Sequence, residues 1–210
     1  IVELTVAAIT SLLPSDPKAV VIACNTATAA ALPQVQAACG EVPVIGIKPD
    51  VERASAAEGT HRILALATQS TINSDSFAAQ LKALEEKGDN NVIIPMGAPC
   101  IVRYVEGNKK DWDGVTAELK EQFSALDAPV DEVVLGCTHF PFAKEAIRAS
   151  LGYDVTFFDA GEKVAETTRD ILEQRSLLTD DPGRGSITFL NSKNDPEMIR
   201  FSYTLFSMDM

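Results

Sequence analysis

The stretch DEVVLGC, residues 131–137, combines an uninterrupted run of aliphatic residues with a Gly-Cys pair at its end. An apolar run without alternation is typical of a strand that is buried on both faces of a parallel sheet. A second stretch, AVVIAC at residues 19–24, has the same character and also ends in a small residue followed by cysteine. Residues 20–24 match residues 133–137 position for position, which indicates a weak internal repeat.

Further apolar, β-rich segments alternate with segments of helical periodicity along the rest of the chain. We expect the other strands at residues 43–48, 62–68, 91–96, 154–159 and 186–191. We expect helices at residues 27–38, 73–87, 111–125, 141–150 and 161–176, and residues 1–13 also have an amphipathic helical pattern. This alternation predicts the α/β class. The polar stretch 49–59 and the region near Gly161 are candidate crossings between domains.

Composition excludes several classes of function. The chain of 210 residues is 46% hydrophobic, enough for a real core, and its net charge of −12 argues against nucleic-acid or anionic-membrane partners. No apolar run approaches the about 20 residues of a membrane span, and no secretory signal opens the sequence. We therefore expect a cytoplasmic location. Because the chain opens at Ile1 directly on a helical pattern, we expect its N-terminus to be truncated or partly disordered.

The four cysteines lack the spacing of a zinc site, and a disulfide is not expected in a cytoplasmic protein. Cys39 and Cys100 are interpreted as buried apolar residues. Cys24 and Cys137 each follow a strand and precede polar residues and a helix, the edge where open α/β sheets bind ligands. A helix N-terminus, or a histidine such as His139, lowers a thiol pKa from about 8.5 toward neutrality, so we expect lowered pKa values at Cys24 and Cys137.

Two matched thiols favour a particular chemistry. A cysteine hydrolase needs one nucleophile and one base, so a second matched cysteine has no role in it. Inversion of a stereocentre needs one group that removes a proton from one face and another that delivers a proton to the opposite face. No GxGxxG dinucleotide motif is present, and the turn-rich DDPGRGS at residues 180–186 lacks the ending of a phosphate loop. We expect neither a cofactor nor a metal.

The residues around both cysteines resemble motifs of the glutamate racemases, in the aspartate/glutamate racemase superfamily. Residues 23–27 (ACNTA) resemble the family's first cysteine motif, and residues 136–141 (GCTHFP) resemble its second, more specific motif. Weaker similarity covers residues 43–49, 67–74 and 158–161, where Ala160 stands in place of the family's serine.

The resemblance implies two three-layer α/β domains with parallel sheets and glutamate bound in the cleft between them. The first domain would comprise residues 1–53 and 162–210, and the second residues 54–161. The implied reaction is cofactor-independent racemisation of L- and D-glutamate, which supplies D-glutamate for peptidoglycan, cell wall biogenesis and cell shape. The implied catalytic residues are Cys24, Cys137, His139 and Glu106. The implied substrate-binding residues are Asn25, Thr26, Thr71, Thr138 and His139.

Plainer structural roles are also open for several of these residues: Asn25 as a helix N-cap, Thr71 as a helix cap, and Glu106 as an ordinary surface carboxylate. The family's Asp-Ser-Gly-x-Gly-Gly and Pro-Tyr-Gly segments have no counterpart here. We therefore expect an incomplete first domain with an unpaired sheet edge, and weak or no activity of this chain alone.

Other functions are also open. The alternatives are a racemase for aspartate or another amino acid, a non-catalytic amino-acid-binding protein, and a hydrolase that uses Cys137 with His139. The hydrolase is disfavoured because residues so near in sequence seldom align as nucleophile and base. The partner we expect is a small amino acid, and a homodimer stays open.

Overall fold

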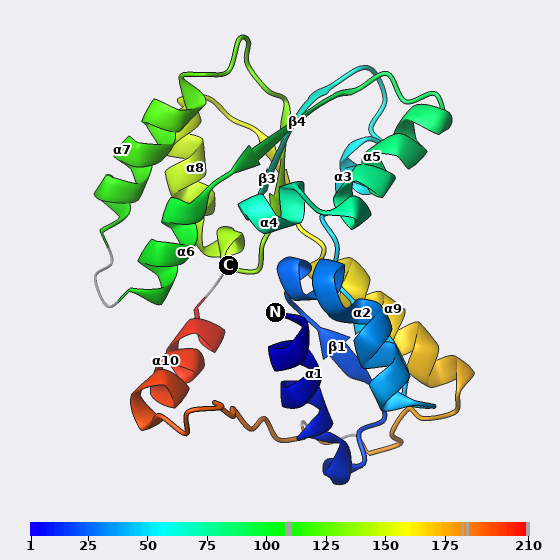
Figure 1. The fold of residues 1–210 in the computed structure, drawn as a ribbon. Helices are drawn as coiled ribbons and strands as arrows, with labels where there is room; N and C mark the ends of the chain where they lie inside the picture. The colour runs from blue at the N-terminus through cyan, green and yellow to red at the C-terminus, as the bar shows by residue number, and fades with distance from the viewer. Residues whose placement is uncertain (108–110, 182, 184, 209–210) are drawn as a thin grey trace.

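The computed structural model describes residues 1–107, 111–181, 183 and 185–208, and contains two α/β units, each built on its own parallel sheet (Figure 1). The first unit holds a two-stranded sheet in which β1 pairs with β2. Its elements are α1 (Val2–Thr10), η1 (Leu13–Ser15), β1 (Val20–Ile22), α2 (Asn25–Cys39), β2 (Val44–Gly46) and α9 (Gly161–Gln174).

The second unit holds a four-stranded sheet in the order β4-β3-β5-β6, with every pair parallel. Its strands are β3 (Arg62–Ala67), β4 (Val92–Gly97), β5 (Glu132–Gly136) and β6 (Thr156–Phe158). Its helices are α3 (Val51–Ala54), α4 (Gln69–Ile72), α5 (Asp75–Glu86), α6 (Pro99–Glu106), α7 (Trp112–Phe123), η2 (Phe140–Ala143) and α8 (Lys144–Leu151). The two-domain α/β class expected from the sequence is confirmed.

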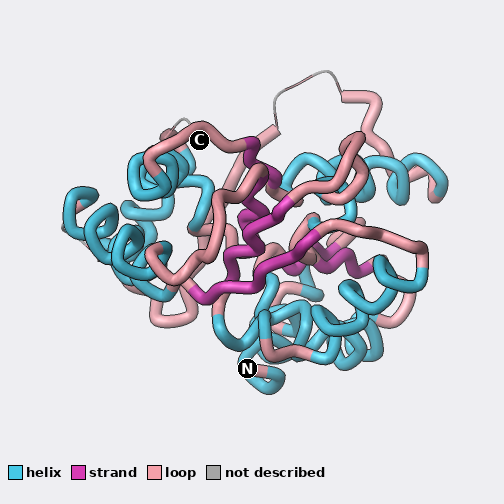
Figure 2. Tube along the Cα trace, turned by 90° about the horizontal axis from the view of Figure 1, so that it is seen from above, coloured by secondary structure: helices cyan, strands magenta, loops and turns pink. Residues whose placement is uncertain are grey.

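The central strands β3 and β5 are buried on both faces, as their uninterrupted apolar runs predict. Leu64 and Val133 pack on one face with residues of α6, α7 and α8, whereas Ile63 and Val134 pack on the other with residues of α3 and α5. Figure 2 shows the strands in the middle with helices on either side. The outer strands β4 and β6 are only partly buried, because each has a neighbour on one side alone.

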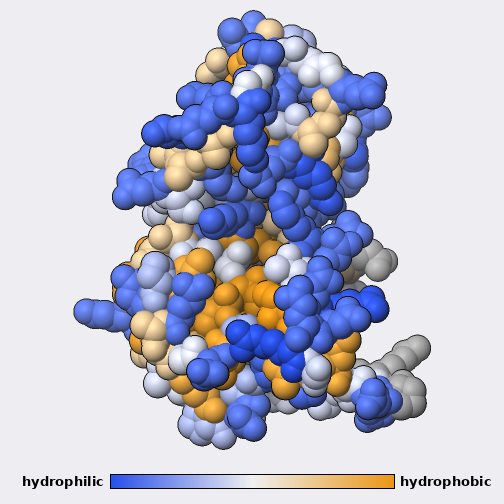
Figure 3. All heavy atoms as spheres, turned by 90° about the vertical axis from the view of Figure 1, so that its right-hand side faces the viewer, coloured by the Kyte–Doolittle hydropathy of each residue, from blue (hydrophilic) through white to orange (hydrophobic). Residues whose placement is uncertain are grey.

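The first unit has a smaller core. Ile22 of β1 and Val35 of α2 are buried against one another, and apolar residues of α1 pack against this cluster. The middle residue of β1, Val21, is nevertheless 41% exposed, so this strand is not buried on both faces as its sequence suggested. On the face seen in Figure 3, the second unit, at the top, is largely hydrophilic, while apolar side chains gather on the first unit, at the bottom. Other exposed apolar residues of this unit are Ile1, Leu4 and Leu12.

Two chain segments cross between the units. The first, at residues 47–50, joins β2 to α3, and the second, at residues 159–160, joins β6 to α9. Helix α9 then contacts β2 in the first unit. After α9, the carbonyl oxygen of Leu177 accepts a hydrogen bond from Lys18 of the first unit, and further along the chain Leu205 packs against the core of the larger sheet, so the C-terminal segment contacts both units. The predicted domain boundaries at residues 53 and 161 stay a prediction.

The C-terminal region corrects one strand prediction. Residues 186–191 form no strand in the described part of the chain; Phe189 packs edge-on against Tyr203 and Phe206 of helix α10 (Pro196–Phe206) instead. Because a β-run is stable only when another strand pairs with it, its composition alone was misleading. Residues 182 and 184 of the turn predicted at 180–186 lie outside the described residues. None of the described helices is long and apolar enough to span a bilayer.

A buried carboxylate, that of Glu132, lies at the start of β5. The side chain of Glu132 is almost fully buried; its Oε1 lies 3.6 Å from Nδ1 of His61, and its Oε2 accepts no hydrogen bond. Burial raises the pKa of Glu132; charge on His61 opposes this and Asp131 adds to it. A carboxyl whose pKa is raised by folding stabilises the fold below its unfolded pKa of about 4.3, and that contribution is lost as the pH rises through the folded pKa.

We therefore expect Glu132→Gln to change the pH dependence of stability. As the pH rises from about 4 to about 7, the free energy of unfolding of the variant should increase relative to that of the unchanged protein, because the amide carries no charge to bury. Urea unfolding at a series of pH values measures this difference. The exposed Glu121→Gln is the matched control. A difference that stays flat across the range would contradict the assignment.

Candidate functional site

Cys24 lies at the junction between β1 and α2. The strand ends at Ile22, and Cys24 keeps an extended backbone as the N-cap residue of α2. Its carbonyl oxygen accepts a hydrogen bond from the amide of Thr28 at 2.8 Å, and its thiol is exposed. The strand-to-helix change therefore presents this sulfur at the carboxyl end of the smaller sheet, where parallel strands leave room for a ligand.

Cys137 occupies the equivalent place in the larger sheet, directly after β5. Its carbonyl oxygen accepts a hydrogen bond from the amide of Phe140, which closes a turn into η2, and its side chain is half-buried. A Cβ at the preceding Gly136 would lie 2.8 Å from the carbonyl oxygen of Leu66, so only glycine fits there. The Gly-Cys order thus allows β5 to pack closely against β3 immediately before the thiol.

A chain of polar contacts extends from Cys137 to Glu106. The Sγ of Cys137 lies 3.5 Å from Nδ1 of His139, and Nε2 of the same ring lies 2.9 Å from Oε1 of Glu106, the last residue of α6. If His139 donates Nε2–H to Glu106, its Nδ1 is free to accept the thiol proton. A turn thus aligns two residues that are close in sequence, contrary to our expectation.

The pKa of Cys137 is raised, which corrects the expectation of a lowered one. Burial is the largest cause; a hydrogen bond from the backbone amide of His139 lowers the pKa, and the charges of Cys24 and Glu106 raise it. The segment that follows Cys137 is a short 3₁₀ turn rather than a full helix. Burial therefore outweighs the stabilisation of a thiolate that the sequence pattern suggested.

Cys24 and Cys137 both border the place where the two units meet. Thr68 directly follows β3, the strand that pairs with β5 just before Cys137, and the hydroxyl of Thr68 lies 2.7 Å from that of Thr26, two residues after Cys24. The two cysteines come from different sheets, and α2 contacts α4 and α5 across the boundary between the units (Figure 1). A cavity of about 160 Å³ lies against Cys137 and Thr138. Cys24 is not among its lining residues, so this cavity extends from Cys137 toward the chain crossings.

Three threonine hydroxyls join the two units beside the thiols. Oγ1 of Thr26, on α2, lies 2.7 Å from Oγ1 of Thr68 and 3.1 Å from Oγ1 of Thr71, and the last two are 3.0 Å apart. Thr68 is the N-cap of α4 and also accepts the amide hydrogen of Thr71. The structure thus brings together Thr26 and Thr71, which the resemblance implies as substrate-binding residues, and places Thr68 beside them. Thr68 lies within the weaker similarity at residues 67–74, but its pattern is that of a helix cap and did not single it out as a site residue.

Asn25 and Thr138 flank the cysteines. Asn25 is the first residue of α2 rather than its N-cap, is 5% exposed, and its Oδ1 accepts no hydrogen bond. A buried acceptor without a donor is costly in isolation, so an external donor would stabilise it. Thr138 is exposed and lines the cavity beside Cys137.

The other two cysteines lie outside the site. Cys39 and Cys100 are both buried, and burial is the largest cause that raises the pKa of each. Among the residues that the structure describes, no three His, Cys, Asp or Glu side chains group closely enough to hold a metal ion. Cys24 is exposed and Cys137 is half-buried, so these two are the accessible thiols of the described chain.

Comparison with known proteins places the chain in a family. The family described as Asp/Glu/Hydantoin racemase matches residues 2–168. A glutamate racemase of Clostridium botulinum (strain Alaska E43 / Type E3) is 35% identical over 204 residues, which is 96% of this chain and 78% of that protein.

Solved structures agree in fold. A glutamate racemase of Bacillus anthracis, 31% identical, matches with a TM-score of 0.66 over 84% of this chain and 68% of its own. The glutamate racemase of Francisella tularensis in complex with D-glutamate, 23% identical, matches with a TM-score of 0.72 over 100% of this chain and 77% of its own. The chain belongs to the Asp/Glu/hydantoin racemase family and, within it, to the glutamate racemases, which are isomerases.

Proposed function

We propose that this protein interconverts L- and D-glutamate without a cofactor, with Cys24 and Cys137 as the two acid/base groups. The observation that carries the proposal is that two thiols from separate sheets lie at the same seam between the units. Cys24 precedes Thr26 by two residues, the hydroxyl of Thr26 lies 2.7 Å from that of Thr68, and Thr68 directly follows the strand that pairs with the strand before Cys137. The relatives at 35% and 31% identity are named glutamate racemases, which supports glutamate as the substrate. The product would then serve peptidoglycan synthesis in the cytoplasm.

The proposed reaction needs one thiolate and one thiol at the start of each turnover. The thiolate of one cysteine takes the Cα proton, and the C–H electron pair stays on the substrate as a carbanion. The thiol of the other cysteine then donates its proton to the opposite face of Cα. The two cysteines end with their protonation states exchanged, and proton transfer through solvent restores the starting state. The reverse direction uses the same groups with exchanged roles.

Neutral groups would hold the substrate. The hydroxyls of Thr26, Thr71 and Thr138 can donate to a carboxylate, and the unpartnered Oδ1 of Asn25 can accept from an ammonium group. Local donors are needed because the net charge of −12 repels an anionic amino acid. Donors to the α-carboxylate would also stabilise the negative charge that develops when Cα loses its proton.

His139 and Glu106 would serve the Cys137 side. With Glu106 accepting from Nε2, Nδ1 of His139 can take the proton of Cys137 and return it, and the carboxylate stabilises the imidazolium formed meanwhile. A cysteine hydrolase uses the same arrangement, but it gives Cys24 no role.

We expect Cys24→Ser and Cys137→Ser each to lower kcat for glutamate racemisation by roughly 10²–10⁴-fold, because each removes one of the two proton-transfer groups. Circular dichroism of D- and L-glutamate measures racemisation, and proton NMR in D₂O measures exchange at Cα. Each variant should keep exchange for one enantiomer more than for the other. The buried Cys39→Ala is the control.

Full activity in either serine variant would refute the two-thiol mechanism. Turnover of aspartate in preference to glutamate by the unchanged protein would move the substrate to the rival amino acid. Amino-acid binding without turnover would instead favour the non-catalytic form.

We expect Glu106→Gln to have two opposite effects. It should lower the pKa of Cys137, because the negative charge of Glu106 raises that pKa, and it should lower kcat, because His139 loses the carboxylate that orients it. The rate of alkylation by iodoacetamide against pH, in the Cys24→Ser background, measures the first effect. Glu118→Gln, whose carboxylate pairs with Arg103, is the control. An unchanged alkylation profile together with unchanged kcat would remove Glu106 from the site.

A further inference from the structure

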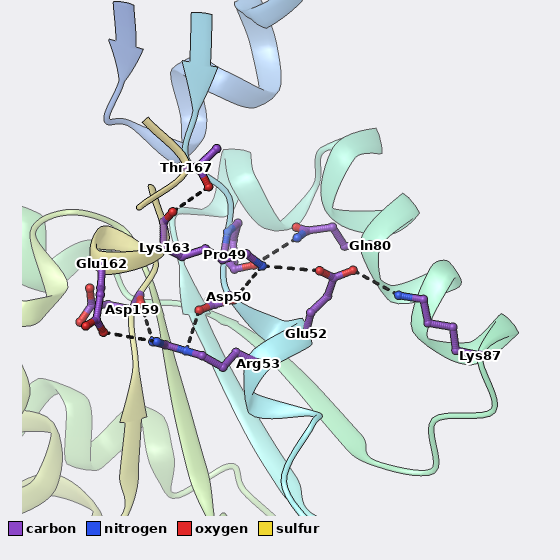
Figure 4. A network of polar contacts seen from close by, with 10 residues as sticks. All are labelled: Pro49, Asp50, Glu52, Arg53, Gln80, Lys87, Asp159, Glu162, Lys163 and Thr167. Atoms are coloured by element: carbon purple, nitrogen blue, oxygen red, sulfur yellow. Dashed lines mark hydrogen bonds and ion pairs between the residues drawn. The ribbon is translucent and has the colours of Figure 1, made fainter. Parts of the chain in front are cut away.

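A cluster of charged side chains lies where the chain crosses between the two units (Figure 4). The first crossing contributes Asp50, the helix that follows it contributes Arg53, and the helix after the second crossing contributes Lys163. These three residues are called the hinge cluster below. They come from segments more than a hundred residues apart in sequence, so their contacts link the two crossings directly.

Arg53 touches both crossings. Its Nε lies 2.9 Å from Oδ2 of Asp50 in the first, and its Nη2 donates to the carbonyl oxygen of Asp159 in the second at 2.8 Å. Its Nη1 lies 3.7 Å from Glu162, and its guanidinium lies over the ring of Phe158, 5.5 Å from the centroid. A planar group with five donors is suited to hold several partners at once.

Asp50 is the buried anion of the cluster. It stands at the N-cap of α3, but its side chain makes no capping bond and is only 1% exposed. Its Oδ2 faces Arg53, and its Oδ1 lies 3.5 Å from Nζ of Lys163. A buried carboxylate must be compensated by opposite charge, so both cations have a reason to stay in place.

Lys163, like Arg53, connects one unit to the other. It lies in the first turn of α9, the helix that contacts β2 of the smaller sheet. Besides Asp50, its Nζ lies 3.7 Å from Oε2 of Glu52, which belongs to α3 of the larger unit. Gln80 of α5 donates to the carbonyl oxygen of Pro49 in the same crossing at 3.1 Å.

The crossings also border the thiol site. Lys48, Asp50 and Lys163 line a hollow of about 230 Å³ on one side of them. Ile47 and Gly161 line the cavity beside Cys137, and Ala160 lines both hollows. A change in the spacing of the two crossings would therefore change the cavity against Cys137 and the orientation of the unit that carries Cys24.

We propose that Asp50, Arg53 and Lys163 are positioning residues that hold the two crossings together and thereby set the separation of Cys24 from Cys137. They touch neither thiol and act through the relative placement of the two units. The kinetic consequence rests on the proposed function, because both thiols must reach one Cα. The geometric consequence does not, because the separation of two thiols can be measured without turnover.

Lys163→Met is the most direct test of the role proposed for the hinge cluster. Its side chain is 53% exposed, so the substitution should leave folding intact, and Arg53 still compensates Asp50. We expect KM for glutamate to rise about three- to fivefold while kcat changes less than twofold, because substrate must then draw the units together. Lys163→Arg should restore KM. Lys87→Met is the matched control: it also removes a cation from Glu52, but within one unit.

A second readout is independent of activity. A short bis-electrophile such as 1,3-dichloroacetone should link Cys24 to Cys137, since Cys39 and Cys100 are buried. We expect Lys163→Met to slow this cross-linking about threefold, with Lys163→Arg and Lys87→Met near the unchanged rate. Arg53→Lys keeps the charge but cannot reach both crossings, so it should also slow the reaction.

The outcomes separate the two proposals. If Lys163→Met and Arg53→Lys both leave the rate of cross-linking unchanged, the positioning role of the hinge cluster is refuted, whatever the effect on KM. If these variants slow cross-linking but the unchanged protein does not racemise glutamate, the positioning role of the hinge cluster is supported and the proposed function is rejected. Slower cross-linking together with a raised KM that Lys163→Arg restores supports both.

Discussion

A parallel strand that is covered on both faces can offer a side chain to a ligand only where the strand ends, and the site of this protein depends on that constraint. Strand β5 lies between β3 and β6 with both faces packed against helices. Its first free side chain at the carboxyl end is Cys137, after a glycine that permits close approach to β3. The same constraint, applied to the smaller sheet, brings Cys24 to the start of α2. Two sheets that face each other with their carboxyl ends can thus oppose two thiols without any residue specific to the pairing.

Burial that positions Cys137 also makes its thiolate harder to form. The pKa of Cys137 is raised first by burial and then by the negative charges of Cys24 and Glu106. A thiol that must exist in both protonation states needs an acceptor close by, and His139 supplies one at 3.5 Å. Glu106 therefore has two opposed effects: its charge raises the pKa of Cys137, while its contact with Nε2 orients His139 to accept the thiol proton. The carboxylate is exposed, so solvent weakens the first effect more than the second, which depends on direct contact.

The sequence predicts the parts of the fold that depend on local pattern and misses those that depend on neighbours. The apolar runs of β3 and β5 predict that these strands are buried on both faces. The repeated pattern of a strand that ends in a small residue followed by cysteine predicts that both thiols lie at the ends of strands. Residues 186–191 have an equally good strand pattern, yet no strand pairs with them in the described residues. The pKa of Cys137 was mispredicted because burial, the largest cause of its rise, depends on how the surrounding chain packs and not on the local pattern. The contact of Glu106 with His139 could be suggested only through resemblance, because 33 residues separate them. Thr68 was missed because a threonine that caps a helix has the same pattern as one that binds a ligand.

The ties between the two units differ in kind from the packing inside each. Within the larger unit, buried aliphatic side chains fill both faces of the sheet, and such cores resist small displacements. At the thiols and at the crossings, the ties between the units include threonine hydroxyls and partly hydrated ion pairs. Contacts of this kind exchange readily with water or ligand at small net cost. An apolar seam would fix the separation of Cys24 from Cys137 at one value, whereas an enzyme must open to admit an amino acid and close to bring both thiols to one carbon. A polar seam with a single well-buried anion, Asp50, allows opening while it keeps one preferred closed arrangement.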